Sequence, residues 1–268
     1  MFVGTLNALD YVHRLNKNSK RTGEVSEKVS SGKRLNKAAD DAAGVTISEG
    51  MRAQIRGLSQ GQRNTQDGVS LLQTADGAMQ EISDQMKRMK EISVEAANGT
   101  CVDEDRQNIG KEFDELKNAI QGIVDTTEFN GIKLLDKNKS LIIQTKDNPY
   151  MEYTVKLYDT NNSTTGINTL SVNTQAGAFN SISELDKAMD MVASNRVKVG
   201  IDLNNLQHEI NGASNTEINT TSSLSIIEDA NMATSLMDLV KNEVITNYSQ
   251  SMFTTANSSP KYIAQLLS

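Results

Sequence analysis

The sequence contains few of the residues that fill compact cores or interrupt helices. Of its 268 residues, 4% are aromatic, none is Trp, and only 2 are Pro. Aromatic rings supply much of the buried area in globular cores, and Pro removes a backbone donor and clashes with the preceding helical turn. These shortages argue against a compact enzyme. They favour long helices in a thin, elongated protein, or in a protein whose core is completed by neighbouring molecules.

Cysteine, apolar runs and positive charge are also scarce. Cys101 is the only cysteine, which excludes an internal disulfide and a cysteine-based zinc site. The formal net charge is −7 and the pI is about 5.0, so the chain lacks a basic balance for nucleic-acid phosphates. No stretch approaches the roughly 20 apolar residues of a membrane span, and the N-terminus lacks the apolar run of a secretory signal peptide. We expect no nucleic-acid partner and no membrane insertion. We also expect the protein to be cytosolic or to leave the cell by a route that does not use a secretory signal peptide.

Candidate catalytic and metal-binding motifs are incomplete. His208-Glu209 begins like the zinc motif H-E-x-x-H, but the second ligand position holds Gly212. Asp103 and Asp105 begin like a calcium loop, but the later ligand positions do not fit, and capping of the following helix explains these carboxylates better. We therefore predict no catalytic residue, no cofactor and no metal, and a protein that is not an enzyme.

Apolar residues recur in three segments with alternating steps of three and four, which place them on one seam of a helix. Three such seams from separated segments predict a long antiparallel helical bundle. The seams consist of Leu72, Ala75, Met79, Ile82, Met86 and Met89; of Ile109, Phe113, Leu116, Ile120 and Ile123; and of Ile182, Leu185, Met189, Val192, Arg196, Val199, Leu203, Leu206 and Ile210, in which Arg196 is the one charged interruption.

Local signals set the expected ends of these helices. The first is predicted from about Leu58 to Ala97, with Asn98-Gly99 ending it because Gly adopts the left-handed cap conformation cheaply. The third is predicted to begin at a capping box of Ser181 and Glu184. Between the second and third helices, residues 140–144 and 151–158 predict two strands divided by a turn at 147–149, and residues 159–166 predict a polar loop.

The two ends of the chain carry apolar residues that neither end can bury by itself. Helices that lack a partner fray or stay unfolded, so we expect the termini to pair with each other or with other copies. The candidate assembly residues are Leu6, Leu9, Val25, Val29, Met237, Val240, Val244, Leu266 and Leu267.

Four segments in order closely resemble bacterial flagellin. They are S-S-G-K-R-L-N-K-A-A-D-D-A-A-G at 30–44, R-N-T-Q-D-G-V-S at 63–70, E-F-N-G-I-K-L-L at 128–135 and S-I-I-E-D-A-N-M-A-T at 225–234. The ending, A-N-S-S-P followed by L-L, is similar too, whereas Thr254-Thr255 and Ser268 depart from the common pattern. The resemblance covers roughly 1–137 and 180–268, with a very short variable middle.

The resemblance implies a mainly α fold: a long antiparallel helical coiled-coil bundle with a small β-hairpin insertion, and termini that are helical when assembled. It divides the chain at 1–40, 41–137, 138–180, 181–230 and 231–268, the outer segments being inner-core helices and the middle one a region that projects outward. It also implies a secreted subunit that self-assembles into the filament of the flagellum for swimming motility. The implied partners are further copies, an export chaperone, the filament cap and hook-associated proteins.

Two alternatives stay open at this point. A hook–filament junction protein shares the terminal helices, and a free helical binding module would stay monomeric with both ends ordered. Heterologous self-contacts that do not close a ring produce a filament, so self-association separates these classes.

Two surface features carry further expectations. In several flagellins a Toll-like receptor binds the segment that matches Arg88, Lys90, Glu91 and Ile92. Here Lys90 replaces a second Arg, and Lys lacks the planar guanidinium of Arg. The alternative is that these charged residues form the solvated face of the helix. Outward loops of several flagellins are O-glycosylated, and the alternative here is an unmodified polar loop. The candidate glycosylation residues are Ser163, Thr164, Thr165, Thr169, Ser171 and Thr174.

Overall fold

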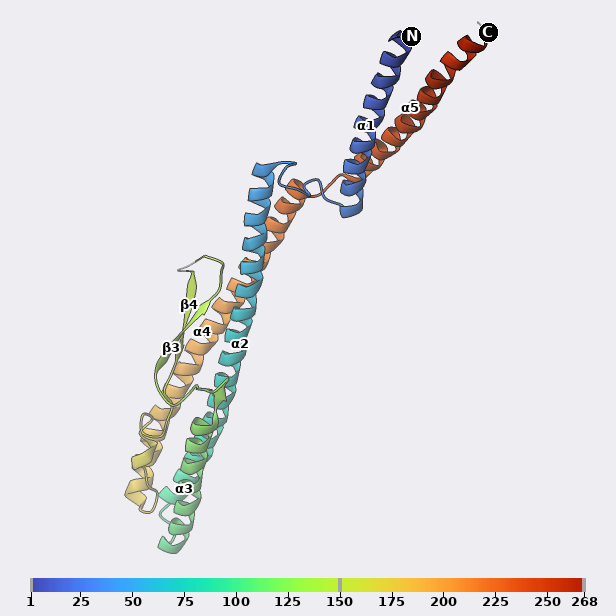
Figure 1. The fold of residues 1–268 in the computed structure, drawn as a ribbon. Coiled ribbons are helices and arrows are strands. Elements are labelled where there is room, and N and C mark those ends of the chain that lie inside the picture. The colour runs from blue at the N-terminus through green and yellow to red at the C-terminus, as the bar shows by residue number, and fades with distance from the viewer. Residues whose placement is uncertain (1, 149–150, 267–268) are drawn as a thin grey trace. The chain divides into compact units, whose positions relative to one another are not determined.

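A computed structural model describes the chain at residues 2–148 and 151–266, with side chains at 9–148 and 151–255. The helices are α1 (Phe2–Ser31), α2 (Ala42–Ala97), α3 (Asp103–Thr126), α4 (Gln175–Glu228) and α5 (Met232–Leu266), with a short 3-10 helix η1 (Ile167–Thr169). The strands are β1 (Glu128–Phe129), β2 (Ile132–Lys133), β3 (Lys139–Gln144) and β4 (Glu152–Leu157) (Figure 1). The predicted mainly α fold with a small antiparallel hairpin is confirmed.

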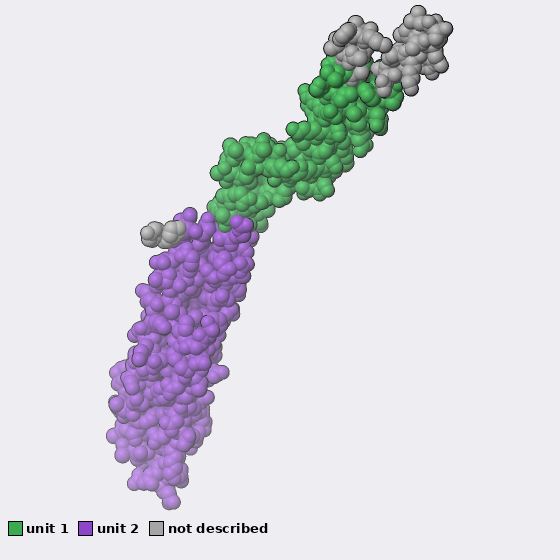
Figure 2. Space-filling model, viewed as in Figure 1, with its two compact units in different colours: residues 1–55, 218–268 green, residues 56–217 purple. Residues whose placement is uncertain are grey.

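The chain forms two compact units. Unit 1 contains residues 1–55 and 218–268, and unit 2 contains residues 56–217 (Figure 2). Helices α2 and α4 each contribute to both units. The five-segment division expected from the sequence is a different partition and stays a prediction.

Unit 2 is an antiparallel bundle of α2, α3 and α4. Lys90 of α2 pairs with Asp186 of α4 at 2.5 Å, and Asp76 accepts a hydrogen bond from Arg196 at 2.9 Å. Because residue numbers rise along α2 while they fall along α4, the two helices are antiparallel. The Arg196 interruption of the third seam is explained by this pairing, since its guanidinium reaches a carboxylate at the edge of the seam.

The three predicted seams form the core of this bundle. All six residues of the first seam are at most 1% exposed. In the second and third seams, fully buried residues alternate with half-buried ones that pack against the same core, as expected for a coiled-coil seam whose edges meet solvent. The fully buried members are Phe113, Ile120, Leu185, Val192, Val199 and Leu206.

Two predicted helix starts are wrong, whereas one predicted end is confirmed. Helix α2 begins at Ala42 rather than near Leu58, but it ends at Ala97 as predicted, although Gly99 does not adopt the left-handed conformation. Helix α4 begins at Gln175, because Thr174 Oγ1 accepts a hydrogen bond from the backbone N–H of Gly177 at 3.1 Å and so caps the helix. Ser181 lies buried inside α4 rather than at its start.

The E-F-N-G segment forms a tight hairpin that follows α3. Strands β1 and β2 pair antiparallel, and the two residues between them, Asn130 and Gly131, have φ values of 50° and 76°. Two consecutive residues with positive φ are typical of the type I′ turn, whose twist matches that of the two strands in a two-residue hairpin, and Asn-Gly is the preferred sequence of this turn. Leu134 and Leu135 follow it and are buried in the core, so the hairpin sets the path of the chain leaving α3.

The β3–β4 hairpin packs along the bundle of unit 2. The Tyr153 hydroxyl donates to Asp202 of α4 at 2.7 Å, and Lys146 pairs with Glu209 of α4 at 3.1 Å. On α2, a Cβ built at Gly61 would lie 2.3 Å from the carbonyl oxygen of Thr145. Glycine on α2 therefore allows the end of the hairpin to approach the helix backbone.

A side chain at Gly61 is expected to push the hairpin off α2. Gly61→Ala should lower the free energy of unfolding by about 1–3 kcal/mol, because a methyl group meets backbone that cannot move aside cheaply. Gly77→Ala, on the same helix with nothing within 4 Å of the new Cβ, should instead raise it by about 0.5–1 kcal/mol through helix propensity. Thermal unfolding followed by circular dichroism compares the two; equal effects of the same sign would contradict this packing.

Candidate functional site

The terminal helices α1 and α5 pair with each other inside unit 1. The Asn18 amide donates to the backbone carbonyl of Asn242 at 2.7 Å and to Thr246 Oγ1 at 2.6 Å, and both asparagines are buried. A buried Asn in a helical seam fixes the register of two helices at some cost in stability. The other residues at seam spacing are half-buried: Tyr11, Leu15, Thr22, Val25 and Val29 on α1, and Leu239, Thr246, Ser249 and Phe253 on α5.

Helix α5 presents more apolar surface away from α1 than toward it. Its face toward α1 is largely polar, whereas Met237, Val240 and Val244 are 65%, 57% and 61% exposed. These three residues, spaced by three and four, form one row on the side of α5 opposite Asn242, and we call them the α5 stripe. An exposed apolar row at heptad spacing is typical of a surface that another helix covers.

The predicted assembly residues therefore fall into separate groups. Val25 and Val29 lie half-buried in the α1–α5 seam, where they stabilise the pairing within one chain. Leu9 of α1 is 59% exposed, like the α5 stripe. The side chains of Leu6 and Leu266, and Leu267 as a whole, lie outside the described residues.

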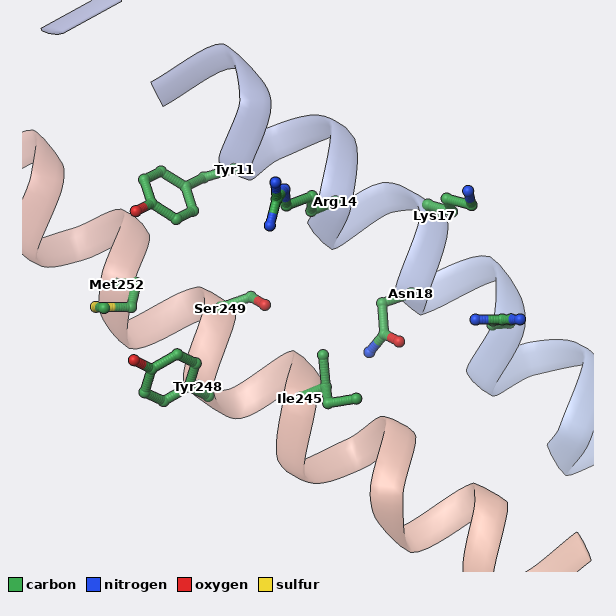
Figure 3. A pocket seen from close by; sticks show the side chains of 9 residues that line it. Tyr11, Arg14, Lys17, Asn18, Ile245, Tyr248, Ser249 and Met252 are labelled. Atoms are coloured by element: carbon green, nitrogen blue, oxygen red, sulfur yellow. The ribbon is translucent and has the colours of Figure 1, made fainter. Parts of the chain in front are cut away.

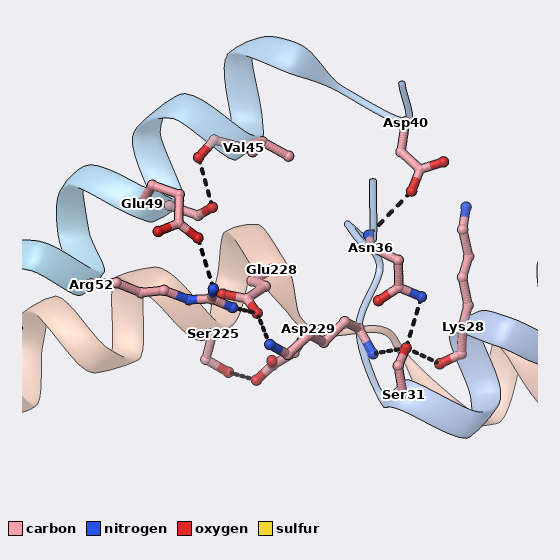
Figure 4. A network of polar contacts seen from close by, with 12 residues as sticks. Lys28, Ser31, Asn36, Asp40, Val45, Glu49, Arg52, Ser225, Glu228 and Asp229 are labelled. Atoms are coloured by element: carbon pink, nitrogen blue, oxygen red, sulfur yellow. Dashed lines mark hydrogen bonds and ion pairs between the residues drawn. The ribbon is translucent and has the colours of Figure 1, made fainter. Parts of the chain in front are cut away.

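The two linkers between helices are joined by a clamp around Glu228 (Figure 4). Lys33 Nζ lies 2.6 Å from Glu228 Oε1, and the guanidinium of Arg52 contacts the same oxygen. The backbone N–H of Arg34 donates to the Glu228 carbonyl at 2.7 Å, and that of Ala230 donates to the Gly32 carbonyl at 2.9 Å. Two of the segments that carry the sequence resemblance, 30–44 and 225–234, thus hold each other.

The charge of Glu228 is stabilised in this clamp. The Glu228 side chain is only 5% exposed, and burial by itself raises the pKa of its carboxyl. Hydrogen bonds from Lys33 and Arg52 and their positive charges lower this pKa by more than burial raises it. The pKa of Glu228 is therefore below its ordinary value. Glu228 also raises the pKa of Arg52. The sequence did not reveal this site, because nearly two hundred residues separate Lys33 from Glu228 and no period connects them.

The adjacent aspartates of the D-D-A-A-G segment cap backbone in the first linker. Asp40 Oδ2 accepts hydrogen bonds from the backbone N–H groups of Asn36 and Lys37, both at 3.1 Å. Asp41 Oδ1 accepts one from the N–H of Gly44 at 3.1 Å, which caps the first turn of α2. Both carboxylates therefore hold this chain's own linker.

The candidate receptor face on α2 differs from the sequence expectation at one residue. Ile92 is 1% exposed and belongs to the bundle core, so it cannot contact a receptor, whereas Val94 is 55% exposed. Arg88 and Glu91 are exposed and pair at 3.2 Å, and Arg88 also reaches Glu112 of α3 at 2.7 Å. The exposed part of this face is thus a network of charges with one apolar residue beside it.

The candidate glycosylation loop also changes at one residue. Thr165 is buried, and its hydroxyl donates to the Asn161 carbonyl at 3.0 Å, so it does not fit a modification site. Ser163, Thr164, Thr169, Ser171 and Thr174 are exposed.

Across residues 2–148 and 151–266, no helix is both long and apolar enough to cross a membrane. In that part of the chain, no group of three or more His, Cys, Asp or Glu is placed to hold a metal ion. Glu209, which follows His208, pairs with Lys146.

An antiparallel helical bundle with paired terminal helices and an exposed α5 stripe is the architecture of a helical structural protein. The chain belongs to the bacterial flagellin family: the models of the bacterial flagellin N-terminal and C-terminal helical regions match residues 5–140 and 182–267. A flagellin of Halalkalibacterium halodurans is 37% identical over 244 residues, which cover 90% of each chain. As a member of this family, the chain is a structural subunit of the flagellar filament.

Solved structures agree with the assignment. The crystal structure of Bacillus cereus flagellin is 34% identical, covers 56% of this chain and 88% of its own, and has a TM-score of 0.51. A Vibrio parahaemolyticus protein described as flagellar hook-associated has a TM-score of 0.61 over 70% of this chain and 99% of its own, but is 16% identical. That likeness shows a shared fold, whereas the sequence relationship favours the filament subunit over a junction protein.

Proposed function

We propose that the chain assembles into the filament through its terminal helices, with the α5 stripe buried against another subunit. The observation that carries this proposal is the arrangement of α5, which turns polar residues toward α1 and leaves Met237, Val240 and Val244 more than half exposed. Complete burial of an aliphatic side chain contributes about 1.5–3 kcal/mol, so covering the rest of the stripe contributes on the order of 3–5 kcal/mol per contact. That contribution helps to offset the entropy of ordering the terminal helices.

Seeded growth tests this function. Purified monomer is added to short filament fragments, and electron microscopy measures their length. Long filaments of uniform width are expected. Monomer that caps the fragments without extending them would point to a junction protein, and monomer that ignores them would point to a free binding module.

Family membership supports the further parts of this proposal. In this proposal the chain has a structural role and no enzymatic one, and it leaves the cell through the flagellar secretion system. The export chaperone, the filament cap and hook-associated proteins are its other partners. Retention of the chain in the cytosol of cells with an intact flagellar export system would contradict this route.

Two surface roles complete the proposal. A Toll-like receptor would contact Arg88, Lys90 and Glu91, with Val94 in place of the buried Ile92; absence of a reporter-cell response to saturating monomer would end this idea. O-glycans would attach at the exposed loop residues Ser163, Thr164, Thr169, Ser171 and Thr174. An intact mass equal to that of the bare chain, measured on protein from its native cells, would end that one.

A further inference from the structure

Three asparagines of the chain are followed by glycine: Asn98, Asn130 and Asn211. In such a pair the backbone nitrogen of glycine can attack the side-chain amide carbon of asparagine, and glycine hinders this attack least because it has no Cβ. Both residues of every pair are exposed, so access to water does not distinguish the three pairs. Their local structures differ, and these differences decide which pair reacts.

The pair at Asn98 lies in the turn that connects α2 to α3. Asn98 Oδ1 accepts a hydrogen bond from the backbone N–H of Thr100 at 3.2 Å. Within the described part of the chain, the N–H of Gly99 donates no hydrogen bond, so its nitrogen can react without breaking one. Asn98 and Thr100 also line an open hollow of about 410 Å³, which admits water to the amide.

The hydrogen bond from Thr100 lies where negative charge develops during the attack. As the nitrogen of Gly99 bonds to Cγ of Asn98, the amide oxygen of Asn98 gains negative charge. A backbone N–H already aimed at such an oxygen stabilises the transition state more than the ground state. The turn therefore supplies a free attacking nitrogen together with a donor for the oxygen.

The other two pairs lack this arrangement. Asn211 and Gly212 lie inside α4, where the glycine N–H is donated to the carbonyl four residues earlier, and attack would break that hydrogen bond. Asn130 and Gly131 form the turn between β1 and β2, and within the described residues the Asn130 side chain accepts no hydrogen bond. Asn18, in the groove between α1 and α5 (Figure 3), is the opposite extreme, because it is helical and buried and its amide donates to two acceptors on α5.

We propose that Asn98-Gly99 is a site of spontaneous deamidation. The nitrogen of Gly99 forms a bond to Cγ of Asn98, and the side-chain amide leaves as ammonia, which carries away the proton of the Gly99 N–H. Water then opens the resulting cyclic imide and leaves aspartate or isoaspartate at position 98. The reaction consumes one water and releases one ammonia, and it needs no oxidant or cofactor. It is independent of the proposed function.

The product changes the connection between α2 and α3 without removing what holds it. Deamidation adds one negative charge, and the isoaspartate form adds a methylene group to the backbone. Arg106, which is 6% exposed, donates to the carbonyls of Ala96 and Cys101, both at 3.0 Å, so the backbone on either side of position 98 stays anchored. The converted fraction therefore increases with the age of the chain while the bundle persists.

Peptide mass spectrometry of the full chain, after incubation in mildly alkaline buffer, tests the proposal. Digestion at acidic pH prevents conversion during preparation. In the folded chain Asn98 should convert about tenfold or more faster than Asn211, and faster than Asn130. In denaturant the three rates should converge, because each asparagine precedes glycine. Conversion of Asn98 no faster than that of Asn130 in the folded chain, or the same ranking in both states, would overturn the proposal.

Variants at Gly99 and Thr100 separate the two parts of the arrangement. A Cβ at Gly99 would have Gln175 Nε2 at 3.7 Å as its nearest neighbour, so Gly99→Ala is accommodated and should slow conversion of Asn98 severalfold by crowding the nitrogen. Asn130 and Asn211 of the same variant are the internal controls and should react as before. Thr100→Pro removes the N–H that donates to Asn98 Oδ1 and should also slow conversion, whereas the matched control Thr100→Ala keeps that N–H and should not. Equal rates in the two Thr100 variants, or unchanged conversion in Gly99→Ala, would reject the site.

Discussion

Replacing Val240 and Val244 together by Asp is expected to stop filament growth while the monomer stays folded. Both side chains are more than half exposed, so in the monomer the new carboxylates remain in water and cost little. Between subunits they would be buried without partners, and burying an unpaired charge costs several kcal/mol. Because each 1.4 kcal/mol is a factor of ten in affinity, the critical concentration should rise about 100-fold or more.

A control with the same added charge makes this result specific. Thr234→Glu with Gln250→Glu also places two carboxylates on exposed positions of α5. Both positions lie roughly a quarter turn or more around the helix from the middle of the α5 stripe. This variant should grow with a critical concentration within about tenfold of the unmodified chain. If both double variants behave alike, the effect arises from net charge, and the α5 stripe is not the assembly surface.

Glu228→Gln should open the clamp between the two linkers. The substitution preserves the shape of the side chain but removes the charge that Lys33 and Arg52 contact. Hydrogen bonds to charged groups contribute about 1.5–3 kcal/mol, so the free energy of unfolding of unit 1 should fall by about 2 kcal/mol. Glu24→Ala, which removes an exposed carboxylate of α1, should change it by less than about 0.5 kcal/mol. Amide hydrogen exchange at Arg34 and Ala230 measures the difference.

The same clamp predicts how stability depends on pH. The pKa of Glu228 is lower in the folded chain than in the unfolded chain, so its contribution is complete above the unfolded pKa, about 4.3, and is lost as pH falls through the folded pKa. The difference in melting temperature between the unmodified chain and Glu228→Gln should therefore be largest near neutral pH and shrink in acid. A difference that stays constant from neutral to acidic pH would show that the charge of Glu228 contributes nothing.

The parts of the fold that the sequence predicted are those where buried residues are apolar and periodic. The residues of the first seam are both apolar and periodic, and all of them are buried. The part of α2 before Leu72 lacks this pattern, because its buried positions include the polar Ser48 and Thr65, and because Gly50 and Gly57 interrupt the apolar spacing. The helix therefore begins well before its apolar period becomes visible.

Local capping signals were less informative than packing. Ser181 and Glu184 match the spacing of a capping box, yet Ser181 is buried within α4 and donates to the Ser171 carbonyl at 3.2 Å. The helix begins earlier because Thr174 supplies the cap and Ala178 extends the buried face. A short motif cannot distinguish a helix start from a polar residue that packs inside a helix.

The candidate site was predicted in part. The sequence indicated that the terminal helices carry unburied apolar residues, but α5 has two rows at heptad spacing, and only the structure shows which row faces α1. The polar row around Asn242 faces α1, and the α5 stripe faces away.

The most direct test of the central claim is the oxidation rate of Met237 in monomer and in filament. Met237 is 65% exposed in the single chain and belongs to the α5 stripe, whereas Met79 is 1% exposed and serves as the buried reference. Mass spectrometry of peptides after brief peroxide treatment gives both rates. The account predicts that Met237 reacts readily in the monomer and becomes nearly as protected as Met79 in the filament. Equal Met237 oxidation in both states would show that the α5 stripe stays in water and would contradict the account.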